Sequence, residues 1–227
     1  DRAVEQAATE TLLKTKLTPP RLRGPLVERE TLYARLDDSL ERRVTLLSTP
    51  AGFGKTTLVR AWIAARADLP PVAWVSLDAG DNDPVRFWRY VLTACASIQP
   101  DLGQETLEIL RHASQPAFEG ALTLFINELA QLPDRALLIL EDYHTITSPR
   151  VHETLAFLLD YLPETLRVVL ITRSDPPLPL AHWRAHGDLC ELRTADLRFS
   201  LQETQRFFQQ TVPFSLAPAT LTQLDKR

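Results

Sequence analysis

One short segment constrains the fold of this chain more than any other: residues 49–57 are Thr-Pro-Ala-Gly-Phe-Gly-Lys-Thr-Thr. A largely apolar run at 43–48 precedes the segment and predicts a strand, and an amphipathic pattern at 56–67 predicts a helix after it. The chain has only 7 glycines, and two of them stand directly before the single lysine found between positions 17 and 225. A glycine-rich turn between a strand and a helix is typical of a phosphate-binding loop, because the backbone N–H groups can curl around an anion there.

The residue types of this loop match the chemistry of nucleotide binding. The helix that begins near Lys55 adds the positive end of its dipole to the pocket. Lys55 is expected to reach the β- and γ-phosphates, and the Thr56 hydroxyl is expected to ligate Mg²⁺. The predicted cofactor-binding residues of the loop are Pro50, Ala51, Gly52, Phe53, Gly54, Lys55, Thr56 and Thr57.

Thr49 departs from the usual Walker A pattern G-x-x-x-x-G-K-[ST], which has glycine at that position. The position lies where the strand ends, furthest from the γ-phosphate, so a small residue other than glycine is acceptable there. The alternative is a glycine-rich turn that binds nothing, but the strand, the loop and the helix all agree with a Walker A loop.

A second apolar run, at 137–140, ends in two acids, Glu141 and Asp142, and matches a Walker B strand. Such a strand supplies one carboxylate to the Mg²⁺ shell and another to orient or deprotonate the attacking water. We assign Glu141 to the metal, through a water, and Asp142 to the attacking water; the shorter aspartate reaches less far, which predicts slow hydrolysis. The alternative is a buried strand that ends in two solvated acids.

Another predicted strand, at 166–171, is followed by Thr172 and Arg173. Because ligands of open α/β sheets bind outside the carboxyl ends of the strands, Thr172 and Arg173 are placed to sense or neutralise the γ-phosphate, and Arg173 is the candidate catalytic residue of the two. A polar sensor strand between the Walker A and Walker B strands is typical of one large branch of P-loop ATPases. The alternative is an Arg173 that pairs with Asp175 or caps the strand.

The order of the predicted elements indicates an α/β fold, a P-loop NTPase with a parallel sheet covered by helices on both faces. Strands are expected at 43–48, 72–77, 136–140, 166–171 and near 189–193, and helices at 56–67, 84–98, 104–112, 117–132, 150–161, 200–211 and from 218. Because the pattern becomes purely helical near residue 200, we expect a nucleotide-binding domain at 1–199 and the beginning of a helical subdomain at 200–227.

Composition excludes several functions for this segment. The formal net charge of −4 argues against direct binding to a nucleic-acid backbone, and the longest aliphatic run, 136–140, is far too short to span a membrane. Cys95 and Cys190 lack metal-site spacing, which predicts reduced thiols in a cytoplasmic protein. The chain lacks methionine and ends soon after a predicted helix start, so we expect a piece of a longer polypeptide.

Six segments together resemble the ATPase core of the large MalT-like, LuxR-type ATP-dependent transcriptional regulators, a branch of the STAND class (signal-transduction ATPases with numerous domains). The resemblance covers about 12–199, and its Gly-Asp-Asn-Asp-Pro and Asp-Tyr-His elements are more specific than a P-loop alone. The segments that carry it are Lys14–Pro20, Thr49–Thr57, Ser76–Tyr90, Leu140–His144, Thr172–Pro177 and Glu191–Phe199.

The resemblance implies a nucleotide-operated switch with ATP or ADP and Mg²⁺ as cofactors. ADP would hold a closed, inactive state, and inducer plus ATP would release a self-associating form that binds DNA through a C-terminal helix-turn-helix absent from this chain. The segment Val27–Arg29 resembles the motif of this class that packs against adenine, so the N-terminal arm, 1–42, is expected to contribute to the adenine site through Val27 and Arg29. The alternative for Arg29 is a surface position at a helix start.

The competing function class is a P-loop enzyme, either a kinase or an AAA+-type mechanical ATPase. A kinase usually has a basic lid, and no Arg/Lys-rich lid is evident in the sequence. His144, which follows the two acids, is assigned to packing, with a place in the lining of the site as the alternative. His182 and His186 are assigned to a solvated helix face; their spacing of four could share a metal, but no third ligand is evident in the sequence.

Overall fold

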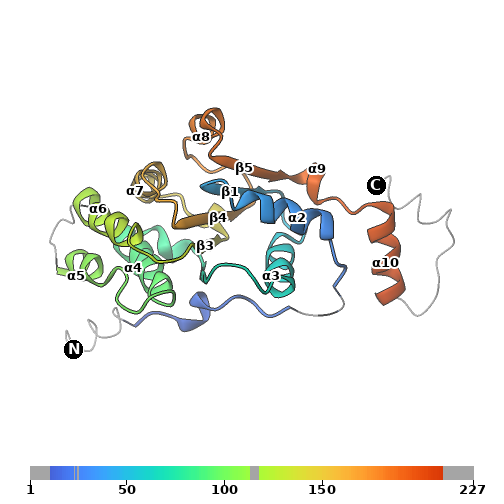
Figure 1. Cartoon of the computed structure of the whole chain (residues 1–227), viewed down its shortest axis with the longest axis horizontal. Helices are drawn as coiled ribbons and strands as arrows, with labels where there is room; N and C mark the ends of the chain where they lie inside the picture. The colour runs from blue at the N-terminus through green and yellow to red at the C-terminus, as the bar shows by residue number, and fades with distance from the viewer. Residues whose placement is uncertain (1–10, 23, 25, 113–117, 212–227) are drawn as a thin grey trace.

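The computed structural model describes residues 11–22, 24, 26–112 and 118–211. Among them, five parallel strands form one sheet in the order β2-β3-β4-β1-β5 (Figure 1). The strands are β1 (Val44–Ser48), β2 (Val72–Ser76), β3 (Ala136–Glu141), β4 (Leu166–Thr172) and β5 (Leu189–Arg193). Each predicted strand is present within a residue of its expected bounds, so the α/β prediction is confirmed.

The register of the sheet brings the polar strand ends together at one edge. Ser48 at the end of β1 lies opposite Thr172 of β4, and Ser76 of β2 lies opposite Glu141 of β3. The strand that carries Thr172 therefore lies between the strand before the glycine-rich loop and the strand that ends in the two acids, as the sequence predicted.

Helices cover both faces of the sheet, because successive side chains of each strand point to opposite sides. Leu47 of β1 packs in a cluster with α2 (Glu30–Ser39) and α3 (Lys55–Ala65), whereas its neighbour Leu46 packs in a larger cluster on the other face. The helices of that second face are α4 (Pro84–Cys95), α5 (Gln104–His112), α6 (Phe118–Leu129), α7 (Pro149–Asp160) and α8 (Leu180–His186).

Shorter segments connect these layers and follow the last strand. The 3₁₀ turns η1 (Lys14–Leu17), η2 (Ala79–Asn82) and η3 (Tyr143–Thr145) belong to these segments, and β5 is followed by α9 (Thr194–Leu197) and α10 (Leu201–Thr211). α10 lies at the opposite end of the molecule from α5 and α6 (Figure 1). It occupies the place of the helix predicted at 200–211, and the helix predicted from Pro218 lies outside the described residues.

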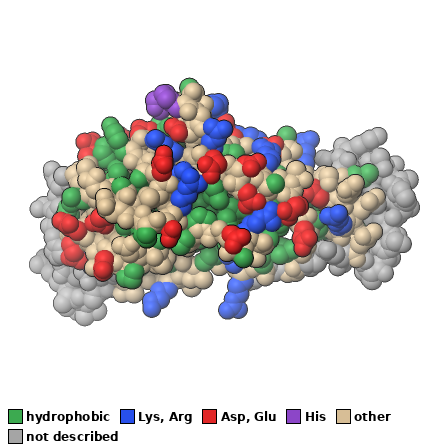
Figure 2. Space-filling view, viewed as in Figure 1, with side chains coloured by type: hydrophobic (Ala, Val, Ile, Leu, Met, Phe, Trp, Pro, Cys, Tyr) green, Lys and Arg blue, Asp and Glu red, His purple; other side chains and the backbone are tan. Residues whose placement is uncertain are grey.

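The distribution of charged side chains and the length of the helices agree with what the composition predicts. On the face shown in Figure 2, acidic and basic side chains are intermixed, in keeping with the formal net charge of −4. Within the described part of the chain, none of the helices has the length and apolar character needed to cross a bilayer.

Candidate functional site

The loop between β1 and α3 has the backbone conformation that its glycines permit. Gly52 has a φ of +87° and Gly54 a φ of +72°, both in the left-handed region that residues with a Cβ rarely adopt. α3 begins at Lys55, immediately after Gly54, so the free N–H groups of its first turn open onto the loop. This is the geometry of an anion site at a helix N-terminus.

The Lys55 side chain lies inside this loop and is 8% exposed. Its Nζ donates hydrogen bonds to the carbonyl oxygens of Thr49 at 2.6 Å and Pro50 at 2.9 Å, and to the Thr49 hydroxyl at 3.2 Å. Burial lowers the pKa of the Lys55 ammonium, the nearby Arg173 charge lowers it further, and Asp142 opposes both. A buried cation that contacts no carboxylate of residues 11–22, 24, 26–112 or 118–211 favours an anion as its partner. Thr49, the residue that departs from the Walker A pattern, supplies two of its three contacts.

The two predicted metal ligands lie in direct contact. The Thr56 hydroxyl donates a 2.6 Å hydrogen bond to Oε1 of Glu141, whose side chain is almost fully buried. The other carboxylate oxygen, Oε2, accepts hydrogen bonds from the Ser76 hydroxyl at 2.7 Å and the Trp74 indole at 3.2 Å. A hydroxyl and a carboxylate at the edge of a phosphate-binding loop fit Mg²⁺, which binds through few protein oxygens and the phosphates of its nucleotide.

Asp142 has an unusual backbone. Its φ of +56° makes it the one non-glycine residue with positive φ in the described part of the chain. The conformation is held locally, because the backbone N–H and the hydroxyl of Thr145 both donate to the Asp142 carbonyl, at 3.0 and 2.9 Å. The Asp142 side chain remains partly exposed. Backbone strain of this kind concentrates at functional sites, and nothing in the sequence pattern signals it.

His144 lies beside Asp142, in keeping with the site-lining role that the sequence left open as the alternative to packing. Its Nδ1 is 3.7 Å from Oδ1 of Asp142 and is buried without a hydrogen-bond partner among the described residues. Burial lowers the pKa of the imidazole, with Asp142 raising it and the charges of Arg173 and Lys55 lowering it. A buried imidazole nitrogen that lies near a carboxylate and has no hydrogen-bond partner among the described residues is suited to contact a polar group brought in by a ligand.

Arg173 is exposed at the end of β4, and its charge acts on both Lys55 and His144. None of the ion pairs found among the described residues includes Arg173. Asp175, the partner considered for it, instead pairs with Arg193 and accepts a 2.8 Å hydrogen bond from the Ser48 hydroxyl. Among the described residues Asp175 therefore pairs with Arg193 and not with Arg173, and the charge of Arg173 lies near enough to the loop to lower the pKa of the Lys55 ammonium.

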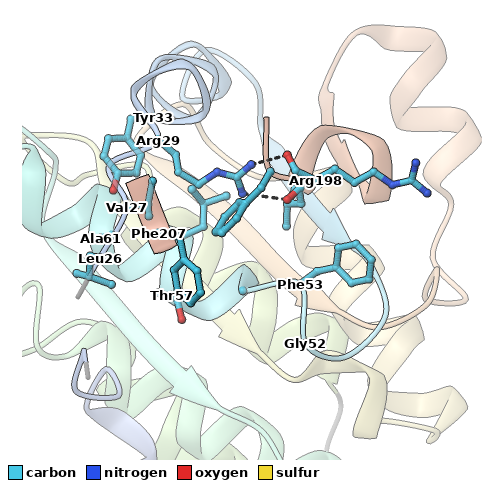
Figure 3. A pocket seen from close by; sticks show the side chains of 14 residues that line it. Leu26, Val27, Arg29, Tyr33, Gly52, Phe53, Thr57, Ala61, Arg198 and Phe207 are labelled. Atoms are coloured by element: carbon cyan, nitrogen blue, oxygen red, sulfur yellow. Dashed lines mark hydrogen bonds between the residues drawn. The ribbon is translucent and has the colours of Figure 1, made fainter. Parts of the chain in front are cut away.

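A cavity of about 380 Å³ adjoins the glycine-rich loop (Figure 3). Three parts of the chain build its walls: the N-terminal arm, the loop with the first turns of α3, and the segment from α9 to α10. The lining residues are Leu26, Val27, Arg29, Tyr33, Gly52, Phe53, Gly54, Thr57, Leu58, Ala61, Leu197, Arg198, Phe199 and Phe207. Most of them are apolar or aromatic, which suits the flat, weakly polar faces of a nucleobase. The structure thus brings Val27 and Arg29 next to the loop.

Arg29 is buried and joins the N-terminal arm to the segment that follows the sheet. Its guanidinium donates to the carbonyl oxygens of Leu197 at 3.0 Å and Arg198 at 2.8 Å, and its Nε donates to Glu203 of α10 at 2.9 Å. The guanidinium also lies over the Phe199 ring, 4.9 Å from its centroid. The surface alternative for Arg29 is therefore wrong. We name these contacts the Arg29 clamp; sequence reasoning missed them because 174 positions separate Arg29 from Glu203.

Comparison with known proteins finds close sequence relatives. No family model matches the chain. It is 36% identical over 217 residues to the HTH-type transcriptional regulator MalT of Cronobacter sakazakii, covering 94% of this chain and 23% of that protein. Regulators of the same name from Serratia proteamaculans and Yersinia enterocolitica are 39% and 38% identical over 202 residues, 87% of this chain and 22% of each relative. The chain thus spans less than a quarter of the length of these curated relatives.

Solved structures offer only distant likenesses. A DNA replication initiation factor aligns with a TM-score of 0.45 at 15% identity, over 87% of this chain and 56% of that chain. A chain of Drosophila ORC bound to DNA aligns with a TM-score of 0.44 at 14% identity, over 77% of this chain and 94% of that chain. Likeness at this level carries no functional argument, and the sheet order and the loop establish the fold.

Proposed function

The chain is a homologue, over most of its length, of one segment of the HTH-type transcriptional regulators named MalT, and we propose that it is the ATP- and ADP-binding switch module of such a regulator. The observation that carries this proposal is the glycine-rich loop with Lys55 inside it and Thr56 bonded to Glu141. A loop, a lysine, a hydroxyl and a carboxylate in this arrangement have the parts that a nucleoside triphosphate with Mg²⁺ requires.

Phosphate binding exchanges one set of contacts of Lys55 for another. In the described structure the ammonium is satisfied by the carbonyls of Thr49 and Pro50, which are neutral acceptors. Phosphate oxygens are charged acceptors, and hydrogen bonds between ionised partners are roughly twice as strong. Thr56 and Glu141 would hold Mg²⁺, which when bound neutralises charge on the β- and γ-phosphates. The N–H groups of the loop and of the first turn of α3 would hold the remaining oxygens.

The cavity beside the loop is the proposed site of the adenine base. Val27 supplies an apolar surface from the N-terminal arm, and Phe199 and Phe207 supply aromatic surface from the segment after the sheet. Arg29 contributes less through contact with the base than through the clamp, which holds that aromatic wall against the arm. The base therefore binds where three parts of the chain meet.

Hydrolysis is assigned to the groups at the ends of β3 and β4. Asp142 would orient and deprotonate the attacking water, and Arg173 would stabilise charge on the γ-phosphate. His144, whose Nδ1 lies 3.7 Å from Oδ1 of Asp142 and accepts or donates no hydrogen bond within the described part of the chain, is positioned to hydrogen-bond the same water or the phosphate. The short aspartate, in a strained backbone, supports slow turnover of the kind that resets a switch.

The output of the module is proposed to be a change of conformation. Because α10 and Phe207 belong to the wall of the base cavity, occupancy of that cavity can bias the placement of α10. ADP would favour one arrangement, and ATP would favour another that self-associates. DNA binding would belong to the helix-turn-helix region of the whole regulator, outside this chain.

Titration of Mg-ADP and Mg-ATP into the chain and two lysine variants tests the nucleotide site. Lys55→Ala is expected to abolish measurable binding, because it removes charge-assisted contacts worth about 1.5–3 kcal/mol each. Lys14→Ala removes an exposed lysine and is expected to bind like the parent chain. Unchanged affinity in Lys55→Ala would refute the phosphate site, and turnover as fast as the roughly 1–100 s⁻¹ of kinases would refute the switch.

A further inference from the structure

Asn82 joins the loop after β2 to the loop after β3. Its side-chain Nδ2 donates hydrogen bonds to the carbonyl oxygens of Ala79 at 3.0 Å and Thr145 at 2.9 Å. Its Oδ1 accepts from the backbone N–H groups of Thr147 at 2.6 Å and Ser148 at 2.8 Å, and from the Thr147 hydroxyl at 3.2 Å. The amide therefore uses both donors and its acceptor oxygen, and most of these bonds go to a single segment, 145–148.

That segment directly follows the strained turn at Asp142. Thr145 lies at the centre of the arrangement: its N–H and hydroxyl hold the Asp142 carbonyl, and its own carbonyl is held by Asn82. Tyr143 anchors the turn from the other side through a buried 2.8 Å hydrogen bond to Nδ1 of His152 on α7. A non-glycine residue stays in the left-handed backbone conformation only where contacts with its surroundings hold it there. Asn82, in the loop after β2, supplies one of these contacts through its hydrogen bond to the Thr145 carbonyl.

Asn82 is itself held rigidly. It ends η2, whose first turn is fixed by the Asp78 carboxylate accepting from the N–H of Gly80 and by Asp81 accepting from the N–H of Asp78. Asp81 is fully buried and pairs with the buried ammonium of Lys16 from the N-terminal arm, which also pairs with Asp78. A buried pair of this kind is costly to break, because each charge would remain without its partner. These hydrogen bonds and ion pairs hold η2 in place, and with it the backbone of Asn82.

We propose that Asn82 is a positioning residue for ATP hydrolysis, because it fixes the turn that presents the Asp142 carboxylate and the His144 imidazole to the terminal phosphate. This inference rests on the proposed hydrolytic role of Asp142. Asn82 does not line the base cavity or the glycine-rich loop, so its effect falls on turnover and leaves nucleotide affinity in place.

The experiment compares Asn82→Ala and Asn82→Asp with a neighbouring control, Asp83→Ala, in the full chain. Asp83 caps α4 by accepting from the N–H of Arg86 at 2.8 Å, so its removal perturbs the same loop without touching segment 145–148. Affinity for Mg-ATP, kcat and thermal unfolding are measured for each protein. The Asn82→Asp carboxylate still accepts from Thr147 and Ser148 but cannot donate to the Thr145 carbonyl, which is the bond that reaches the strained turn.

Asn82→Ala is expected to lower kcat by about 10- to 100-fold while Kd changes by less than about threefold, because small displacements of a catalytic group cost up to about 100-fold. Asn82→Asp is expected to fall between Asn82→Ala and the parent, and Asp83→Ala to keep the parental kcat. In an Asp142→Asn background, adding Asn82→Ala should lower the residual rate by much less than about 10-fold, because the Asp142 carboxylate is already absent and only the placement of His144 is left to disturb.

The remaining outcomes separate failure of this inference from failure of the proposed hydrolytic function. A parent chain that hydrolyses no ATP overturns the proposed hydrolytic function and this inference together. A parent that hydrolyses ATP, with Asn82→Ala at the parental kcat or Asp83→Ala slowed equally, overturns this inference alone. If Asn82→Ala does not fold, Asn82→Asp decides: reduced kcat at parental Kd supports the role, and parental kcat refutes it.

Discussion

Replacing Gly54 with alanine isolates the backbone conformation of the glycine-rich loop. Gly54 has φ +72° and ψ +22° immediately before α3. A Cβ built there meets no heavy atom within 4 Å, so the substitution adds no steric clash with neighbouring residues. The remaining cost is that of holding an L-residue in the left-handed region, about 1–2 kcal/mol. For a domain of this size, that free energy lowers Tm by about 2–8 °C.

Gly120 provides a matched control in the same chain. It lies in the helix α6, and a Cβ built there also meets no heavy atom within 4 Å. Because its backbone is helical, Gly120→Ala is expected to raise the free energy of unfolding by about 0.5–1 kcal/mol. The two substitutions add the same methyl group to open space and differ only in the backbone that receives it, so their effects should have opposite signs.

Urea and thermal unfolding of the nucleotide-free proteins measure both effects. Gly54→Ala should unfold at lower urea than the parent with an unchanged m-value, and Gly120→Ala should unfold at higher urea than the parent. A Gly54→Ala variant as stable as the parent, or more stable, would mean that residue 54 does not adopt the left-handed conformation. The geometry of the phosphate-binding loop would then be wrong.

Three further predictions concern residues around the site. Arg29→Ala should lower the free energy of unfolding by about 1.5–3 kcal/mol in urea titrations, because it removes charge-assisted bonds to Glu203 and two carbonyls; an unchanged midpoint would contradict the clamp. Glu141→Gln should retain Mg-free ADP binding but lose most of the Mg²⁺ enhancement, as measured by calorimetry, and a parental Mg²⁺ response would exclude Glu141 as a metal-site residue. Burial lowers the pKa of His152, and a hydrogen bond that the imidazole donates to the Ile146 backbone opposes this shift, so the folded chain binds protons less readily there than the unfolded chain. The contribution of His152 to the free energy of unfolding is therefore fully present above the unfolded pKa of about 6.5 and is lost as pH falls through the lower folded pKa. His152→Asn should reduce the fall in the free energy of unfolding between pH 7 and pH 5. An unaltered dependence of that free energy on pH would refute the prediction.

The sheet and its helices could be predicted because local sequence determines them. Apolar runs such as 136–140 are explained by burial on both sides of a parallel sheet, where every residue of β3 is buried. The start of α4 followed from Asp83 and Pro84, a cap and a residue that already has a helical φ. α2 was not predicted as a helix, although Leu32, Tyr33 and Leu36 form its buried face, because a segment of only 10 residues with two adjacent aspartates gives a weak periodic signal.

The candidate site was predictable where function depends on residue type and strand position. Lys55, Thr56 and Glu141 were assigned from a loop and a strand end, and they lie together because parallel strands end at one edge. The left-handed backbone of Asp142 and the placement of His144 depend on tertiary contacts from other elements. The Arg29 clamp likewise depends on contacts between distant parts of the chain, so no local pattern could reveal it.

We propose above all that the identity of the bound nucleotide, ADP or ATP, sets the placement of α10. Hydrogen exchange of the full chain, saturated in turn with Mg-ADP and with a non-hydrolysable analogue of Mg-ATP, tests that claim most directly. The account predicts different protection of the amides at 197–208 in the two states, because this segment forms the wall of the base cavity and is held by Arg29. Tight binding of both nucleotides with identical protection throughout 197–208 would contradict it.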